Sequence, residues 1–205
     1  MKQIDKKQVE ILLQKSLNIY HYGSFVYKTF VQDISDYDYV LILPNEYGIY
    51  DLEQFECGDC QYNIYTVDTW KRKLKEHDVC AVETFFLPTE YIVKENIKFD
   101  FVLEKEKLRE SFSRTASNSY VKCKKKLEVV EDFNPKIAKK SIWHSLRILN
   151  FGIQILTEGA ISDYTAMNYL YNEIINSTSQ DWEYYKTKYK PIYNSLKTEF
   201  RKVSV

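Results

Sequence analysis

Two carboxylates near the N-terminus have the spacing of a metal-binding pair. Asp36 and Asp38 are separated by one residue, and Asp38 opens a continuous β-prone run, residues 38–43. Residues two apart in a strand point to the same face of its sheet, so both carboxylates are expected on one side. Mg²⁺ prefers oxygen ligands and bridges phosphate oxygens. The pair therefore predicts a Mg²⁺ site, with Asp36 and Asp38 as metal ligands and catalytic residues.

A Gly-Ser pair precedes these carboxylates. Gly23 and Ser24 follow a short β-prone segment, residues 19–22. Glycine lets backbone N–H groups approach a phosphate closely, and the serine hydroxyl adds a donor. Lys28 and Thr29 lie near enough in the sequence to assist. This arrangement predicts that Gly23, Ser24 and Lys28 bind a nucleoside triphosphate, whose pyrophosphate bound metal ions can stabilise as it leaves.

The segment from Tyr22 to Asp38 resembles the signature of the nucleotidyltransferase superfamily of DNA polymerase beta. That signature is Gly-Ser, a spacer, and Asp-x-Asp at the start of an apolar strand. The segment is most similar to the predicted nucleotidyltransferases associated with RNA repair, which read tyrosine-Gly-Ser, an aromatic residue, and then Ser-Asp-x-Asp. The resemblance implies Mg²⁺-dependent transfer of a nucleoside monophosphate from an NTP to an acceptor hydroxyl. An RNA end, a protein and a small molecule all remain open as the acceptor.

Two later stretches also resemble that family. In the first, a basic helix leads to Glu83, which either contacts the substrate or is a paired structural residue. In the second, Lys140, His144 and Arg147 are spaced so that they share one face of a helix. The resemblance implies that Lys140 and Arg147 contact the nucleotide, because arginine and lysine both bind phosphate. The alternative is a solvated helix face on which His144 merely packs.

One departure from the family concerns the third carboxylate, which the superfamily supplies from the strand after Asp-x-Asp. Here that strand offers Gln61 and Asn63, and Asp59 lies just upstream. Asp59 is therefore the candidate third metal ligand if the strand begins early enough. Without a third acid, the alternative is a catalytically inactive nucleotide-binding or antitoxin-like regulatory module of the same fold.

The cysteines give a different hypothesis. Cys57 and Cys60 form a C-x-x-C pair, and His77 and Cys80 form an H-x-x-C pair. This spacing is compatible with a structural Zn²⁺ site in an RNA-binding protein. The alternative is reduced thiols that pack as small hydrophobic side chains.

Periodicity predicts how these residues are positioned. A helix is expected at 6–17, strands at 38–43 and 61–67, and a turn-rich connection at 45–60. Beyond residue 100 the pattern is helical, at about 104–130, 135–158, 161–176 and 181–201. We therefore expect an α+β chain, with a small mixed-sheet nucleotidyltransferase domain at 1–100 and an all-helical domain at 101–205.

Charge and hydropathy limit the partners. The chain has 29 basic and 29 acidic residues, so affinity for nucleic acid requires a local patch. The basic stretch 114–126 is one candidate, although acidic residues flank it. No apolar run is long enough to cross a bilayer, and the N-terminus lacks the apolar core of a signal peptide. We expect a cytoplasmic protein that binds no membrane.

Overall fold

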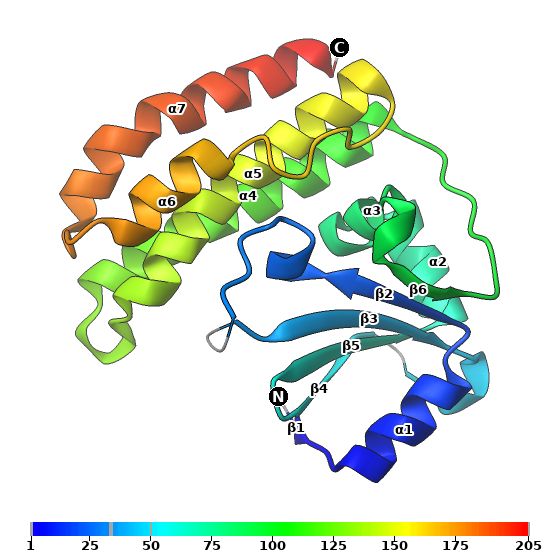
Figure 1. The fold of residues 1–205 in the computed structure, drawn as a ribbon. Coiled ribbons are helices and arrows are strands. Elements are labelled where there is room, and N and C mark those ends of the chain that lie inside the picture. Colours follow the sequence, from blue (N-terminus) through cyan, green and yellow to red (C-terminus); the bar gives the residue numbers. More distant parts are fainter. Residues whose placement is uncertain (1, 33–34, 50, 205) are drawn as a thin grey trace. The chain divides into compact units, whose positions relative to one another are not determined.

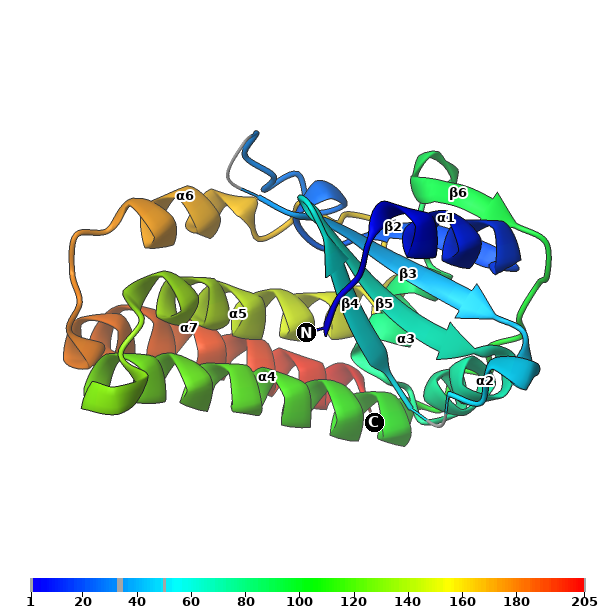
Figure 2. The ribbon, with the colours of Figure 1, turned by 90° about the horizontal axis from the view of Figure 1, so that it is seen from below.

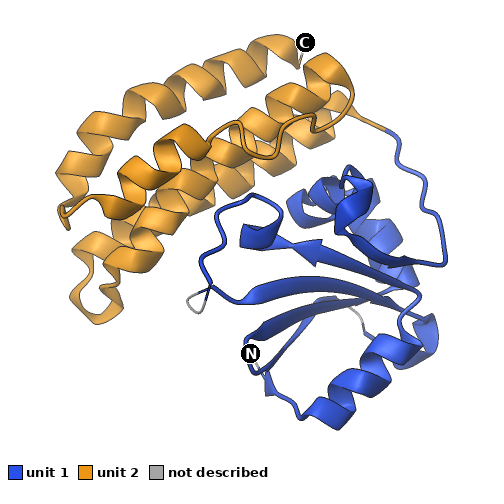
Figure 3. Cartoon of the chain, in the orientation of Figure 1, with its two compact units in different colours: residues 1–102 blue, residues 103–205 orange. Residues whose placement is uncertain are grey.

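The chain forms two compact units, residues 1–102 and residues 103–205 (Figure 3). The computed structural model describes residues 2–32, 35–49 and 51–204. The first unit combines a mixed sheet with helices, and the second is helical, which confirms the predicted α+β class. Among the described residues, no helix is both long enough and apolar enough to span a bilayer.

The first unit is built on a six-stranded mixed sheet (Figure 1). Across the sheet the strands follow the order β1 (Lys2–Gln3), β4 (Glu53–Cys57), β5 (Cys60–Thr66), β3 (Tyr37–Leu43), β2 (Asn18–Tyr22) and β6 (Ile92–Glu95). The β3–β5 and β1–β4 pairs are parallel, and the other pairs are antiparallel. Among the strands of this sheet, the central β3 and β5 carry most of the buried apolar residues, as their β-branched and aromatic composition predicts.

Alternation along the strands gives the sheet two different faces. One face carries an apolar cluster that includes Leu41 and Ile64, and α1 (Lys6–Lys15) covers it through Val9. Tyr39 and Tyr62 stack on this same face, with ring centroids 5.5 Å apart. The opposite face, where α2 (Val67–Lys75) and α3 (Val79–Phe85) lie, carries the residues at even positions of β3 (Figure 1).

Three strands differ from the sequence-based expectation, among them the two-residue strand β1, which was not predicted. β4 lies inside the segment 45–60, which was predicted to be a turn-rich connection, and β6 was not predicted at all. Both are short, and β4 begins with the exposed residues Glu53 and Gln54. Their polar composition does not predict strands. They form only because β5 and β2 offer hydrogen-bonding edges, to which β4 and β6 respectively pair. The predicted turn does occur, at Gly58 and Asp59 between β4 and β5.

The second unit consists of α4 (Lys105–Glu128), α5 (Pro135–Glu158), α6 (Asn168–Asn176) and α7 (Trp182–Val203). Asn134 caps α5, Pro135 occupies its first turn, and Gly159 ends it with φ +80°. These are the start and stop signals that the sequence contains. α5 contacts the other three helices and lies alongside α4 (Figure 2), so it forms the core of this unit. α6 begins later than the predicted residue 161.

Candidate functional site

The Gly-Ser turn lies directly beside the carboxylate pair. Gly23 directly follows β2 and has φ +67°, a conformation that favours glycine. A β-carbon at Gly23 would lie 2.1 Å from Oδ2 of Asp38, so no other residue fits without moving that carboxylate. The close approach arises because Tyr22 and Asp38 are paired across β2 and β3. Antiparallel pairing therefore brings the two halves of the motif together.

The chain after Gly23 forms a tight turn. A short 3₁₀ helix runs over Gly23–Phe25, and the Thr29 amide donates to the Ser24 carbonyl at 2.9 Å. Lys28 has φ +54°, which is uncommon for a residue other than glycine, and its side chain is exposed. Asp33 and Ile34, in the spacer between the two halves of the motif, lie outside the described residues.

The two carboxylates share their face of the sheet with an amide. Asp36 immediately precedes β3 and is exposed, whereas Asp38 is half-buried. In the parallel β3–β5 pair Asp38 lies opposite Gln61. The Gln61 side chain donates to Oδ2 of Asp36 at 2.6 Å. Three polar side chains therefore gather where β3 begins, and the one from β5 is neutral.

Asp59 lies in the turn that precedes β5, and its side chain is exposed. Its carbonyl oxygen accepts a hydrogen bond from the Tyr37 amide at 2.8 Å, which ties the turn to the start of β3. Within residues 2–32, 35–49 and 51–204, no group of three or more His, Cys, Asp or Glu side chains is arranged to hold a metal.

The donor set at β3 fits Mg²⁺ delivered with a nucleotide. Proteins commonly hold Mg²⁺ through one or two carboxylates, with phosphates and water completing the octahedron. Asp36 and Asp38 supply two such carboxylates, both beside the Gln61 side chain. Rotation of the Gln61 amide would turn its carbonyl oxygen toward the same position.

Glu83 of α3 fixes the segment around the Gly-Ser turn from inside the unit. It is fully buried, and its Oε2 accepts hydrogen bonds from the hydroxyls of Tyr27 at 2.6 Å and Tyr22 at 3.0 Å. These tyrosines lie on either side of Gly23, so Glu83 holds both ends of the turn. The structure therefore shows Glu83 as a paired residue, which is the second of the two interpretations that the sequence left open. No sequence pattern predicts Tyr27 as its partner, because no periodicity links a loop tyrosine to a distant helix.

In the second unit, the three residues expected on one face of α5 differ in how deeply they are buried. Lys140 is exposed, whereas Arg147 is fully buried. Nη2 of Arg147 lies 2.8 Å from Nδ1 of His144, and the guanidinium carbon lies 4.8 Å from the centroid of the Phe151 ring. Arginine can only donate, so Nδ1 of His144 accepts. Burial and the charges of Arg147 and Lys122 hold the pKa of His144 well below its ordinary value.

The cysteine pairs lie on opposite sides of the sheet. Cys57 and Cys60 face one another across the β4–β5 turn and pack beside the apolar cluster under α1. His77 is buried, and Cys80 of α3 lies on the other side, with its Sγ 3.9 Å from the Tyr65 hydroxyl. Burial raises the pKa of the Cys80 thiol, which keeps it protonated.

Most of the basic residues in the stretch 114–126 of α4 form ion pairs with acidic residues close to them. Arg114 pairs with Glu110 at 3.3 Å, Lys124 with Glu128 at 3.6 Å, and Lys125 with Asp132 at 3.2 Å. Local acids therefore neutralise much of the charge that nucleic-acid binding would require.

Comparison with known proteins gives little further information. No protein-family model and no curated protein matches the chain. Among solved structures, it is similar to a nucleotidyltransferase-like protein from Exiguobacterium sibiricum 255-15, with a TM-score of 0.34 and 11% sequence identity. The match covers 97% of this chain and 72% of that chain. A similarity this low assigns neither a fold family nor an activity.

Proposed function

We propose that the first unit is a nucleotidyltransferase domain of the DNA polymerase beta type, which binds a nucleoside triphosphate with Mg²⁺. The observation that carries this proposal is the approach of Gly23 to the Asp38 carboxylate. Such an approach joins a glycine turn suited to phosphate with an acidic pair suited to Mg²⁺ in a single site. Neither feature alone would distinguish this function.

The proposed roles follow from position and exposure. The backbone of Gly23 and the Ser24 hydroxyl would bind the triphosphate, and the exposed ammonium of Lys28 would contribute charge. Asp36 and Asp38 would hold Mg²⁺, which would neutralise charge on the phosphates when bound. In the second unit, Lys140 is exposed, so its ammonium is accessible to a phosphate, whereas Arg147 is buried.

The proposed reaction is attack of an acceptor hydroxyl on the α-phosphorus of the NTP. The new bond joins the acceptor oxygen to that phosphorus, the bond to the bridging oxygen of pyrophosphate breaks, and the hydroxyl proton leaves. The resemblance to proteins associated with RNA repair makes an RNA end the first acceptor to test. A protein side chain and a small molecule are the other acceptor classes.

A second candidate function is nucleotide binding without transfer, as in an antitoxin-like regulatory module. Gln61 favours it, because this amide occupies the position on β5 beside Asp38 and contacts Asp36 at 2.6 Å. A neutral amide cannot accept the proton of an acceptor hydroxyl as a carboxylate can. Binding requires only the turn and the acidic pair.

Two measurements on the full chain separate these functions. Calorimetry with each NTP, with and without Mg²⁺, tests binding, and NTPs radiolabelled at the α-phosphate, incubated with and without RNA, test transfer. The D36N/D38N variant should lose both. The control E90Q/D100N, which changes two exposed carboxylates outside the site, should retain both.

Each outcome has a defined meaning. Label in RNA, protein or a small product, lost in D36N/D38N, supports the transferase and identifies its acceptor class. Binding without label supports the silent module, and Gln61→Glu then tests whether an acid at this position restores transfer. Absence of Mg²⁺-dependent binding to every NTP would overturn both candidates.

A further inference from the structure

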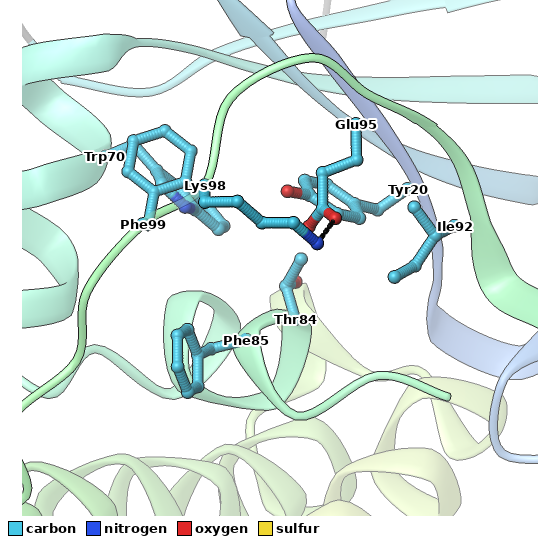
Figure 4. A pocket seen from close by; sticks show the side chains of 8 residues that line it. All are labelled: Tyr20, Trp70, Thr84, Phe85, Ile92, Glu95, Lys98 and Phe99. Atoms are coloured by element: carbon cyan, nitrogen blue, oxygen red, sulfur yellow. Dashed lines mark hydrogen bonds and ion pairs between the residues drawn. The ribbon is translucent and has the colours of Figure 1, made fainter. Parts of the chain in front are cut away.

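The first unit contains a cavity that the proposed nucleotide site does not use. It has a volume of about 270 Å³ and lies among β2, β6, α2, α3 and the segment that follows β6 (Figure 4). Four aromatic side chains contribute to its walls: Tyr20, Trp70, Phe85 and Phe99. Trp70 is almost fully buried, whereas Phe85 is 39% exposed. A cavity of this size and lining suits one small ring.

Asn18 holds two walls of this cavity in place. It is fully buried, and its side-chain oxygen accepts from the amides of Asn96 at 3.0 Å and Ile97 at 3.1 Å. Its side-chain nitrogen donates to the Ile97 carbonyl at 2.8 Å and to the Tyr20 hydroxyl at 2.6 Å. The segment leading to Phe99 and the Tyr20 ring are therefore fixed before any ligand arrives.

The lining of the cavity includes one acidic side chain, Glu95, whose ion-pair partner is held only weakly. Glu95 forms an ion pair with Lys98, whose side chain is 86% exposed, whereas that of Glu95 is 22% exposed. Exposed ion pairs of this kind contribute little free energy, so another cation can replace Lys98. Burial, together with the charge of Glu95, raises the pKa of Tyr20 to about 12 although Asn18 opposes the shift. The Tyr20 hydroxyl therefore keeps its proton beside the carboxylate.

Thr84 supplies a second polar group. It is 3% exposed, and among the described residues its Oγ1 is buried without a hydrogen-bond partner. In Figure 4 its side chain points toward the Glu95–Lys98 pair. A buried hydroxyl without a partner costs free energy, which a ligand with a suitable donor would recover.

We propose that this cavity binds a small planar cation, an amidine or guanidine carried on an aromatic ring. One edge of the cation would replace Lys98 at Glu95 with two parallel hydrogen bonds, and a remaining N–H would reach Thr84. The ring would pack against Trp70 and Phe99, whose faces attract a nearby positive charge. This binding does not depend on the nucleotide function proposed for Gly23 and Asp38.

Benzamidine is the probe, tested on the full chain by calorimetry and by saturation-transfer NMR. The neutral analogue benzamide has nearly the same shape and should bind at least about tenfold more weakly, because it forms no ion pair. Saturable binding of benzamidine is the expected result. No saturable binding, or equal binding of benzamide, would overturn the proposal.

Substitutions locate the binding. Glu95→Gln should weaken benzamidine binding by about tenfold or more, and Thr84→Val by about fivefold. Lys98→Met should strengthen it, because it removes the competing ammonium and keeps the aliphatic stem. Glu90→Gln changes an exposed carboxylate that does not line the cavity and should have no effect. Unchanged affinity for benzamidine in both Glu95→Gln and Lys98→Met would place the binding elsewhere and refute the assignment. If Glu95→Gln fails to fold, the surface variant Lys98→Met alone tests whether benzamidine binds at this cavity.

Discussion

The α-carbon of Gly23 faces the side chain of Asp38, and a β-carbon at Gly23 would lie 2.1 Å from Asp38 Oδ2 and 2.9 Å from its Cγ. Both the carboxyl oxygen and the carboxyl carbon would therefore lie closer to the β-carbon than van der Waals contact allows. A side chain at position 23 would have to displace the whole Asp38 carboxylate.

Gly23→Ala should therefore abolish Mg²⁺-dependent NTP binding. Gly48→Ala is the matched control, because Gly48 has a similar φ of +65° but nothing lies within 4 Å of a β-carbon there. Backbone strain should cost each variant about 1–3 kcal/mol of unfolding free energy, and Gly23→Ala should lose more because its β-carbon also clashes with Asp38. Calorimetry should show that only Gly48→Ala retains nucleotide binding. Equal retention in both variants would remove Gly23 from the site.

Tyr27→Phe should destabilise the protein by about 1–3 kcal/mol, because it removes a donor from the buried Glu83 carboxyl group. Urea unfolding measures this change. Tyr169→Phe, at a tyrosine that is 69% exposed, should stay within about 0.5 kcal/mol of the wild type. If the two variants unfold alike, the contact between Tyr27 and Glu83 adds no stability.

His144 should make the protein less stable in mild acid. Its pKa in the folded state lies well below the ordinary 6.5, so the unfolded chain binds a proton that the folded chain rejects. The stabilising contribution is complete above pH 6.5 and is lost as the pH falls toward the folded-state pKa, at up to about 1.4 kcal/mol per pH unit.

His144→Asn tests this dependence, because asparagine keeps an acceptor for Arg147 but does not titrate. Unfolding free energies of both proteins should be compared from about pH 7.5 to pH 5.5, across the ordinary histidine pKa. The wild type should lose more stability than the variant over this range. Parallel pH profiles would contradict the assignment to His144.

Gly152→Ala should destabilise the second unit although alanine favours helices. A β-carbon at Gly152 of α5 would lie 2.6 Å from the ring of Phe200 in α7, and Phe200 is 1% exposed. Overpacking of this kind costs about 1–3 kcal/mol, which exceeds the gain of about 1 kcal/mol in helix propensity.

The double variant Gly152→Ala/Phe200→Leu should recover part of the loss, because leucine is smaller than the phenylalanine ring. A double-mutant cycle by thermal or urea unfolding gives the coupling energy between the two positions. A coupling energy near zero would show that the contact does not limit packing.

Local patterns identified much of this molecule. The structure confirms the helix predicted from its caps at Asn134 and Gly159, which is α5, and the strand predicted from its apolar run, which is β3. They succeeded because caps and strand alternation depend on residues close together in the sequence. β4 and β6 were missed because their stability comes from pairing with β5 and β2, which no local pattern records.

The sequence by itself determined the α+β class and the candidate motif, since glycine, serine and two aspartates at a fixed spacing are local features. Only the tertiary structure decided that Gly23 touches Asp38, that Gln61 contacts Asp36, and that Glu83 accepts from Tyr27. Strand register and helix packing set these contacts between residues distant in the chain. The same packing buried Arg147 and left Lys140 exposed on one helix.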